Sequence, residues 1–454
     1  MFKSSRYNYF SVLPGGKELL FNFLTLRLIA FEAKEAAKAH RILADPVLPP
    51  RRGEARLTQL LLRNGFLVDE GTDETAPLER EFRKSRDEER ILSLTVLPTL
   101  ACNFRCSYCY EDHSAPLQMS REVEDALIAF VQERLHDGGR MSVVWFGGEP
   151  LLMKKTIGTL SRAFLDLCEA RRAEYSASMI TNGYLLDGAT AAWLKGLKVW
   201  TAQVTLDGPP EVHDLRRPLA TGGKTFRMIV DNLKAAVDFL EISVRVNVDA
   251  TNRDSLGRFL DHMIDEGIAA KAGIYPALTG PFTSACGHIA DQCLGREEFS
   301  IVSLETSLEL TRRGLSDRQF PAAQDLPCGA LRRGNFIVTP SGGLAACWNR
   351  VAVPEKHIGH LLSPPTKEMD RERESWFDFD PFRLECRECL VLPICMGACA
   401  HQYFEKGQLA CSGWKHHPQE HILNYYRLRV LQQQSEIVGG FKAIVKALEK
   451  SKGV

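Results

Sequence analysis

Residues 102–109 read CNFRCSYC, and the fold and chemistry expected of the chain follow from this stretch. It spaces Cys102, Cys106 and Cys109 as Cys-x3-Cys-x2-Cys, directly after the strand-like run ILSLTVLP at 91–98. Three thiolates from one short loop can hold three corners of a cubane iron–sulfur cluster and leave the fourth iron open. The alternative is structural zinc, which needs a fourth ligand that His113 could supply.

Around this loop, strand-like and helix-like segments alternate from residue 91 to about residue 315. About six such units in a row predict an α/β fold with a parallel sheet, open or curled into a barrel. Residues of functional type follow the strands, at the edge where such folds build their sites. Two examples are Gly147-Gly148-Glu149-Pro150 after SVVWF and Thr181-Asn182-Gly183 after SASMI.

A second group of cysteines lies in the C-terminal part of the chain, which we expect to be irregular from residue 316 to 435. Free cysteines are usually scattered core residues, so two dense groups indicate two cofactor-bearing regions. Metal clusters could stabilise a region that buries little apolar surface. A terminal helix is expected at 436–454. The seven cysteines are Cys328, Cys347, Cys386, Cys389, Cys395, Cys399 and Cys411.

The N-terminal segment, residues 1–80, predicts a small α+β module that resembles a winged helix. Two β-prone runs flank Pro14-Gly15-Gly16 as a hairpin, helices are expected at 32–43 and 54–64, and a short strand at 66–70. Residues 81–90 belong to a charged run without a wide apolar face, which predicts a solvated linker or bridging helix.

Composition excludes several classes of protein. The chain has 454 residues, 57 Lys+Arg against 57 Asp+Glu, and 13 Cys. A zero net charge argues against a nucleic-acid binder, and 44% hydrophobic residues argue against disorder. The first residues do not build a signal peptide, and no apolar run is long enough for a membrane span. We therefore expect a cytoplasmic protein whose grouped thiols serve metal chemistry rather than disulfides.

The first cysteine group, with Tyr108 before its last cysteine and Gly147-Gly148-Glu149 after the second strand, resembles the radical S-adenosylmethionine (SAM) superfamily over residues 91 to about 315. This resemblance implies a partial (β/α)6 TIM-like barrel. It also implies a [4Fe-4S] cluster whose open iron chelates SAM, and reductive cleavage of SAM to a 5′-deoxyadenosyl radical. Cys102, Cys106 and Cys109 would hold that cluster.

The resemblance also implies residues that contact SAM. Tyr108 would lie near the adenine, Gly147 and Gly148 would let the backbone approach the methionine part, and Glu149 would accept from its ammonium group. Later strands would contribute further contacts, although Arg245 could instead form a core ion pair and Thr181-Asn182-Gly183 could be a turn alone. These further contacts are Thr181, Asn182, Gln203 and Arg245.

The second cysteine group resembles the SPASM domain, an extension found on radical SAM peptide and protein maturases. This implies two auxiliary [4Fe-4S] clusters and thus three in all; paired zinc sites are the alternative. Cluster I would take Cys328, Cys347 and Cys399, leaving an open iron or a place for Cys286 or Cys293. Cluster II would take Cys386, Cys389, Cys395 and Cys411.

The resemblance favours modification of a ribosomally made precursor peptide, by crosslinking or thioether formation. The N-terminal module would bind the precursor as an added strand, or else simply cap the barrel, and a flavodoxin or ferredoxin would donate electrons. A sulfatase-maturase-like oxidation to formylglycine is the specific alternative, but Trp348 occupies the position of the acidic proton acceptor of those enzymes. A non-catalytic Fe–S electron carrier is the alternative of another class. Neither a catalytic proton acceptor nor a nucleic-acid or membrane partner is indicated.

Overall fold

The computed structural model describes residues 1–13, 16–46, 50–111, 117–315 and 320–438. The predicted Pro14-Gly15 turn, His113 and the terminal helix beyond Val438 lie outside the described residues.

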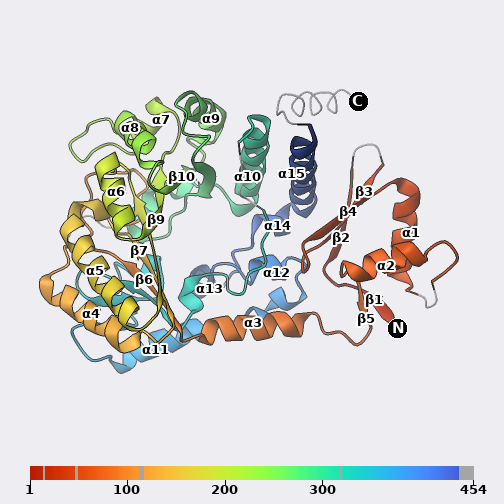
Figure 1. Ribbon diagram of the computed structural model, residues 1–454, viewed down its shortest axis with the longest axis horizontal. Helices are drawn as coiled ribbons and strands as arrows, with labels where there is room; N and C mark the ends of the chain where they lie inside the picture. The colour runs from red at the N-terminus through yellow and green to blue at the C-terminus, as the bar shows by residue number, and fades with distance from the viewer. Residues whose placement is uncertain (14–15, 47–49, 112–116, 316–319, 439–454) are drawn as a thin grey trace.

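The centre of the molecule is a nine-stranded sheet, and its six parallel strands β6 to β11 lie side by side in chain order (Figure 1). The predicted α/β fold with a mostly parallel sheet is therefore confirmed. In the described part of the chain, β11 pairs with β10 alone, so the sheet is open at that edge. The six strands are β6 (Ile91–Val96), β7 (Arg140–Trp145), β8 (Glu174–Thr181), β9 (Val199–Thr205), β10 (Glu241–Val248) and β11 (Gly273–Leu278).

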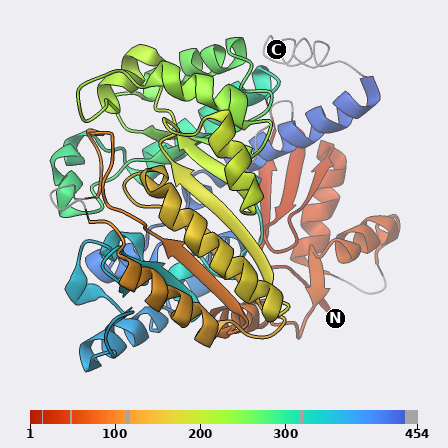
Figure 2. The same ribbon diagram turned by 60° about the vertical axis from the view of Figure 1, so that its left-hand side comes forward.

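Helices connect these strands and cover the outer face of the sheet, with α4 and α5 in orange and gold in Figure 2. Ser120 caps α4 as expected, since its side chain accepts from the Val123 amide. On α5, Phe164 is buried and stacks on Trp145 of β7, with ring centroids 6.5 Å apart. The principal helices are α4 (Arg121–Arg134), α5 (Lys154–Ala170), α6 (Gly188–Gly196), α7 (Pro210–Arg216), α8 (Phe226–Ala236), α9 (Leu256–Asp265) and α10 (Arg296–Arg312).

Three strands of this sheet come from the C-terminal part of the chain, which the sequence did not predict. Strand β12 (Asn335–Val338) pairs parallel with β6, and β13 (Gly343–Ala345) and β14 (Gly359–His360) continue antiparallel. The region that carries Cys328 and Cys347 is therefore attached to the strand that leads into the first cysteine group.

The N-terminal module has a three-stranded antiparallel sheet, β2 (Asn8–Val12), β3 (Glu18–Asn22) and β4 (Arg27–Phe31), with α1 (Ala33–Ala44) and α2 (Ala55–Arg63). The short predicted strand is β5 (Leu67–Asp69), which pairs with β1 (Phe2–Ser4). The expected hairpin gains the extra strand β4, because the Asn22 side chain accepts from the amides of Leu24 and Thr25 and turns the chain.

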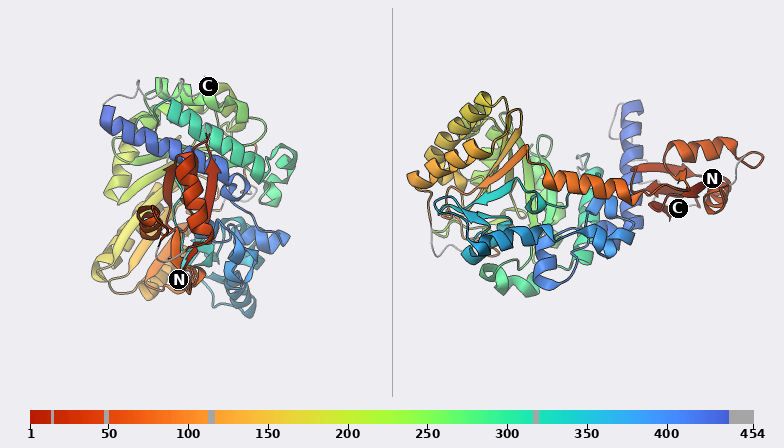
Figure 3. Two further views of the ribbon diagram at one scale, coloured as in Figure 1. Left: turned by 90° about the vertical axis from the view of Figure 1, so that its right-hand side faces the viewer. Right: turned by 90° about the horizontal axis from the view of Figure 1, so that it is seen from below.

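Of the two predictions for residues 81–90, a solvated linker or a bridging helix, the structure shows the helix, although one of its residues is buried rather than solvated. Helix α3 (Thr75–Asp87) runs from the N-terminal module to the central sheet (Figure 3). Its Phe82 is fully buried and meets Phe382 edge-to-face at 5.6 Å, while Arg83 pairs with Asp380 at 3.0 Å. Phe82 thus packs on a residue about 300 positions later in the chain. An analysis of hydrophobic periodicity within the helix cannot detect such a contact.

The prediction of an irregular region up to residue 435 was wrong at its end. Helices α11 (Lys367–Phe377), α13 (Ala400–Lys406), α14 (Gly413–His416) and α15 (Pro418–Val438) lie within it. Tyr425 of α15 and Trp414 both pack on Phe21 of β3, at 5.8 and 6.3 Å. These contacts hold the N-terminal module against the rest of the protein, so α15 is ordered by tertiary packing rather than by its own pattern. Within the described residues, none of the helices combines the length and apolar character of a membrane span.

Substitution Phe82→Ala should lower the free energy of unfolding by roughly 3–5 kcal/mol, because it opens a cavity at a fully buried ring contact. Chemical denaturation measures this loss. The control Arg80→Ala changes an exposed residue of the same helix and should cost less than about 0.5 kcal/mol; equal losses in the two variants would show that α3 does not anchor the module.

Candidate functional site

The loop after β6 carries the first cysteine group. Burial, with a smaller contribution from neighbouring thiols of the same loop, raises the pKa of the Cys102 and Cys109 thiols to about 12. Without a counter-charge these thiols would stay protonated. Three buried thiols on one loop suit an iron–sulfur cluster, since bound iron supplies that charge and keeps the thiolates deprotonated.

The loop after β7 lies directly on the cysteine loop. A side chain at Gly148 would overlap the backbone of Leu100 and Ala101, and one at Gly147 (φ +113°) would overlap the Thr99 carbonyl. The Gly148 and Glu149 amides donate to the carbonyls of Thr99 and Ala101. The two glycines are therefore required for contact between the loops, which is a different reason from the predicted approach of the methionine part of SAM.

Glu149 connects a third strand to this pair of loops. Its fully buried carboxylate accepts from Thr181 Oγ1 (2.8 Å), the Asn182 amide (2.8 Å) and the Leu151 amide (3.0 Å). The Asn182 side chain in turn donates to Asn103 (2.7 Å) and lies 3.9 Å from Cys102 Sγ. Thr181 and Asn182 thus form more than a turn, because they join the end of β8 to the cysteine loop.

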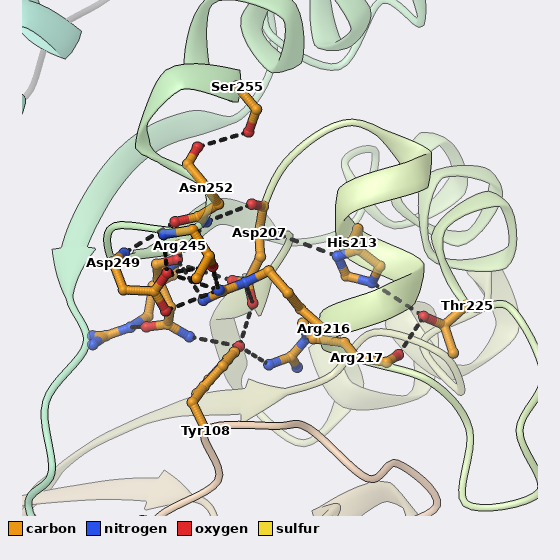
Figure 4. A network of polar contacts seen from close by, with 12 residues as sticks. Tyr108, Asp207, His213, Arg216, Arg217, Thr225, Arg245, Asp249, Asn252 and Ser255 are labelled. Atoms are coloured by element: carbon orange, nitrogen blue, oxygen red, sulfur yellow. Dashed lines mark hydrogen bonds and ion pairs between the residues drawn. The ribbon is translucent and has the colours of Figure 1, made fainter. Parts of the chain in front are cut away.

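Tyr108 lies at the centre of a buried polar network (Figure 4). Its hydroxyl bonds to Asp207 (2.5 Å), to Arg217 Nη1 (2.6 Å) and to Asn247 (3.0 Å). The Arg216 guanidinium lies over the Tyr108 ring at 4.9 Å. The hydroxyl is therefore occupied by protein groups, and the Arg216 guanidinium lies over the ring.

Arg216 completes the network by pairing with Asp249 (2.8 Å) and Asp207 (3.5 Å). Burial opposes the charge of Arg217, but the thiol of Cys106 and the Tyr108 hydroxyl outweigh it and the pKa of Arg217 is raised. Arg217 is therefore a buried cation beside the first cysteine group, and its Nε has no hydrogen-bond partner within the described structure. Both arginines belong to the run TLDGPPEVHDLRRP, residues 205–218.

Gln203 and Arg245 lie on the neighbouring strands β9 and β10. Gln203 Oε1 accepts from the Tyr275 hydroxyl at 2.5 Å, and Arg245 Nε donates to Asn247 at 2.8 Å. Arg245 thus belongs to the layer of side chains around Tyr108, and it bonds to the side-chain amide of Asn247 rather than to a core carboxylate. Contact of either residue with SAM stays a prediction.

Glu111 was missed by sequence reasoning. It follows Cys109 by two positions, and burial raises the pKa of its carboxyl to about 8. Neither carboxylate oxygen has a partner in the described structure. A lone acid after the cysteine motif carries no pattern that a sequence reading could have detected.

The seven C-terminal cysteines fall into two groups. Burial raises the pKa of Cys347 to about 12, and the thiols of Cys328 and Cys399 add to that rise. The other four line one small cavity of about 20 Å³ beside Lys415. These four are Cys386, Cys389, Cys395 and Cys411. The first group has the members predicted for cluster I and the second those predicted for cluster II; that either group holds a cluster stays a prediction. In the part of the chain that is described, no three His, Cys, Asp or Glu side chains gather at the distances of a single metal ion.

Cys286 and Cys293 have neighbours of their own. Cys286 Sγ lies 3.4 Å from the Thr283 carbonyl, and the pKa of Cys293 is raised by burial, Asp249 and Cys286. The thiols that act on the pKa of Cys347 are instead Cys328 and Cys399. A role of either cysteine at cluster I stays a prediction that these contacts do not favour.

Three aromatic rings connect the two cysteine regions. Tyr110, next to Cys109, stacks on Phe146 at 6.5 Å, and Phe146 meets Trp348, next to Cys347, at 4.5 Å. Trp348 is 36% exposed. An aromatic surface thus stands where a sulfatase-maturase-like chain would place an acid, and a ring of this kind cannot accept a proton.

Residues 96–262 match the family model described as the radical SAM superfamily. The chain therefore contains a radical SAM domain, and this domain implies a [4Fe-4S] cluster and SAM.

Curated relatives include sulfatase-maturating enzymes. A cysteine-type enzyme of Clostridium perfringens is 29% identical over 166 residues, covering 35% of this chain and 43% of that protein. A serine-type enzyme of Klebsiella aerogenes is 24% identical over 343 residues, covering 69% of this chain and 81% of that protein. The chain thus spans less than half of the length of the Clostridium perfringens relatives it matches.

Solved structures share the fold. Native anSMEcpe with bound AdoMet matches with a TM-score of 0.58 and 18% identity, covering 76% of this chain and 99% of that chain. Streptococcus suis SuiB bound to S-adenosylmethionine matches with a TM-score of 0.50 and 14% identity, covering 89% of this chain and 97% of that chain.

Substitution Gly148→Ala should separate the glycine loop from the cysteine loop and cost about 1–3 kcal/mol in stability through overpacking. Iron content after anaerobic reconstitution and thermal unfolding measure the effect, and both should fall. Gly196→Ala is the matched control, because a methyl group at this helical glycine meets nothing within 4 Å. Loss of iron in the control as well would contradict the importance of the loop contact.

Proposed function

We propose that this chain is a radical SAM/SPASM maturase that modifies a ribosomally made precursor peptide. The observation that carries the proposal is the arrangement of ten cysteines in three groups, one of them on the loop that Gly147-Gly148 and Asn182 hold in place. In this proposal the groups hold three [4Fe-4S] clusters. We divide the chain into a recognition module (1–80), a linker (81–90), the radical SAM core (91–315), a SPASM region (316–435) and a terminal segment (436–454).

The protein residues would bind and orient the cofactors. When bound, the cluster and SAM supply a 5′-deoxyadenosyl radical that abstracts hydrogen from a C–H bond. The Tyr108 ring would face the adenine while its hydroxyl is held by Asp207 and Arg217. Glu149 fixes the positions of Asn182 and Thr181 beside Cys102, and the buried Arg217 offsets negative charge at the cluster.

The N-terminal module supports a peptide substrate. Within the described residues β4 pairs with β3 alone, and the opposite edge strand β2 is packed by α15. The free edge of β4 can therefore accept an added strand. Hydrogen–deuterium exchange tests this: a precursor peptide encoded beside this chain should protect the amides of residues 27–31, but not those of 8–12. Binding without protection at 27–31 would contradict the assignment.

A sulfatase-maturase-like activity is the second candidate, and the named relatives favour it. It requires a proton acceptor near cluster I, where this chain has Trp348. Under our proposal Trp348→Ala should reduce peptide modification several-fold while SAM cleavage without peptide is unchanged, because Trp348 would contact substrate rather than SAM. Mass spectrometry of peptide and 5′-deoxyadenosine measures both. Oxidation of a sulfatase peptide to formylglycine would decide for the second candidate.

A non-catalytic electron carrier is the alternative of another class. The reconstituted protein with dithionite and SAM should release 5′-deoxyadenosine, and Cys106→Ala should abolish it, because the SAM-binding cluster would lose a ligand. Chromatography of the products measures this release. A protein that keeps all its iron and releases no 5′-deoxyadenosine would favour the carrier.

A further inference from the structure

A cationic cavity lies on the outer surface of the radical SAM domain, between the helices α5 and α6. Its volume is about 480 Å³. Gly158 of α5 faces Trp193 of α6 at the floor of this space. We call it the basic pocket. It is lined by Lys154, Lys155, Gly158, Arg162, Asp187, Ala189, Thr190 and Trp193.

The charge of the basic pocket is unbalanced. Three cations line it against the single carboxylate of Asp187, in a chain whose net charge is zero. Asp187 is itself used, since it caps α6 by accepting from the Thr190 amide. The nearest acid along α5 after Arg162 is Asp166, one turn further from the pocket. Lys155 and Arg162 are both exposed and form no ion pair within the described residues, so their charges face solvent.

Helix stability does not explain the two lysines. Lys154 and Lys155 are the first two residues of α5, and the first turn contains no acid. Cations at a helix N-terminus oppose the helix dipole. Lys154 recovers a hydrogen bond to Thr190 (2.6 Å), whereas Lys155 is exposed. Lys155 therefore opposes the stability of its own helix, which indicates that this side chain serves a function instead.

The two helices that line the basic pocket follow the strands whose ends meet the cysteine loop. Helix α5 begins five residues after Glu149, and α6 begins six residues after Asn182, which lies 3.9 Å from Cys102 Sγ. Both helices thus start at the edge of the sheet that carries the cysteine loop. Leu152, which precedes Lys154 by two positions, is a large apolar side chain that is 43% exposed.

We propose that the basic pocket and Leu152 form the docking surface for an acidic one-electron carrier protein that reduces the SAM-binding cluster. This inference rests on the proposed function, because it assumes that the first cysteine group holds that cluster. One electron leaves the reduced carrier and enters the cluster, so the carrier is oxidised by one electron and no bond forms. A small apolar contact ringed by charges suits such a transient redox encounter.

Charge complementarity of this kind acts on the rate of encounter and weakens with salt. The test mixes the anaerobic reconstituted protein with a reduced, acidic flavodoxin and follows bleaching of the iron–sulfur absorbance. Lys155→Glu should slow this reduction about 10-fold at low ionic strength. The difference from the unmodified protein should disappear at high salt. Dithionite, which needs no docking surface, should reduce both proteins at the same rate.

The matched control is Lys195→Glu, which makes the same charge change in the last turn of α6, at the far end from Asn182. This variant should be reduced by flavodoxin at a rate within about twofold of that of the unmodified protein. A carbodiimide cross-link between flavodoxin carboxylates and Lys154 or Lys155, located by mass spectrometry, gives a readout independent of activity.

Equal rates for Lys155→Glu and Lys195→Glu, or cross-links elsewhere, would overturn the docking surface. Failure of the proposed function is distinguishable, because the protein would then release no 5′-deoxyadenosine even with dithionite.

Discussion

The close contact between two backbone loops is the constraint on which the site depends. The loop after β6 carries three thiols, and the loop after β7 lies on it so closely that residues 147 and 148 must be glycine. Glu149 then extends the contact to β8 through the Thr181 hydroxyl and the Asn182 amide. Three strand ends are thereby fixed around one cysteine loop before any cofactor is considered.

Burial gives this arrangement its chemical character. Thiols with pKa values raised to about 12 are poor ligands until a metal replaces their protons. Arg217 is a buried cation beside these thiols. The Tyr108 hydroxyl next to it is held in place by hydrogen bonds with Asp207 and Asn247. The second cysteine region depends on the same sheet, because β12 pairs with β6. One sheet therefore positions both regions, and the rings of Tyr110, Phe146 and Trp348 span the space between them.

Much of the core was predictable from sequence, because periodicity and cysteine spacing are local signals. The parallel strands β6 to β11 and the Ser120 cap were predicted, while the assignment of ten cysteines to three clusters stays a prediction. The misses concern contacts between distant parts of the chain. Strand β12 is short and not distinctive, Phe82 is one apolar residue in a charged helix, and α15 depends on Phe21 of β3. The roles of Arg216 and Arg217 likewise depend on Asp249 and Cys106, which only the fold brings near them.

The central claim is that three groups of cysteines hold three clusters, one of which binds SAM. Iron and sulfide analysis of the anaerobically reconstituted chain, combined with electron paramagnetic resonance, tests it most directly. The account predicts about 12 iron atoms per chain, about 4 fewer when Cys102, Cys106 and Cys109 are all replaced by Ala, and a reduced-cluster signal that changes on addition of SAM only when those three cysteines are present. Bound zinc in place of iron, or a signal that does not respond to SAM, would contradict it.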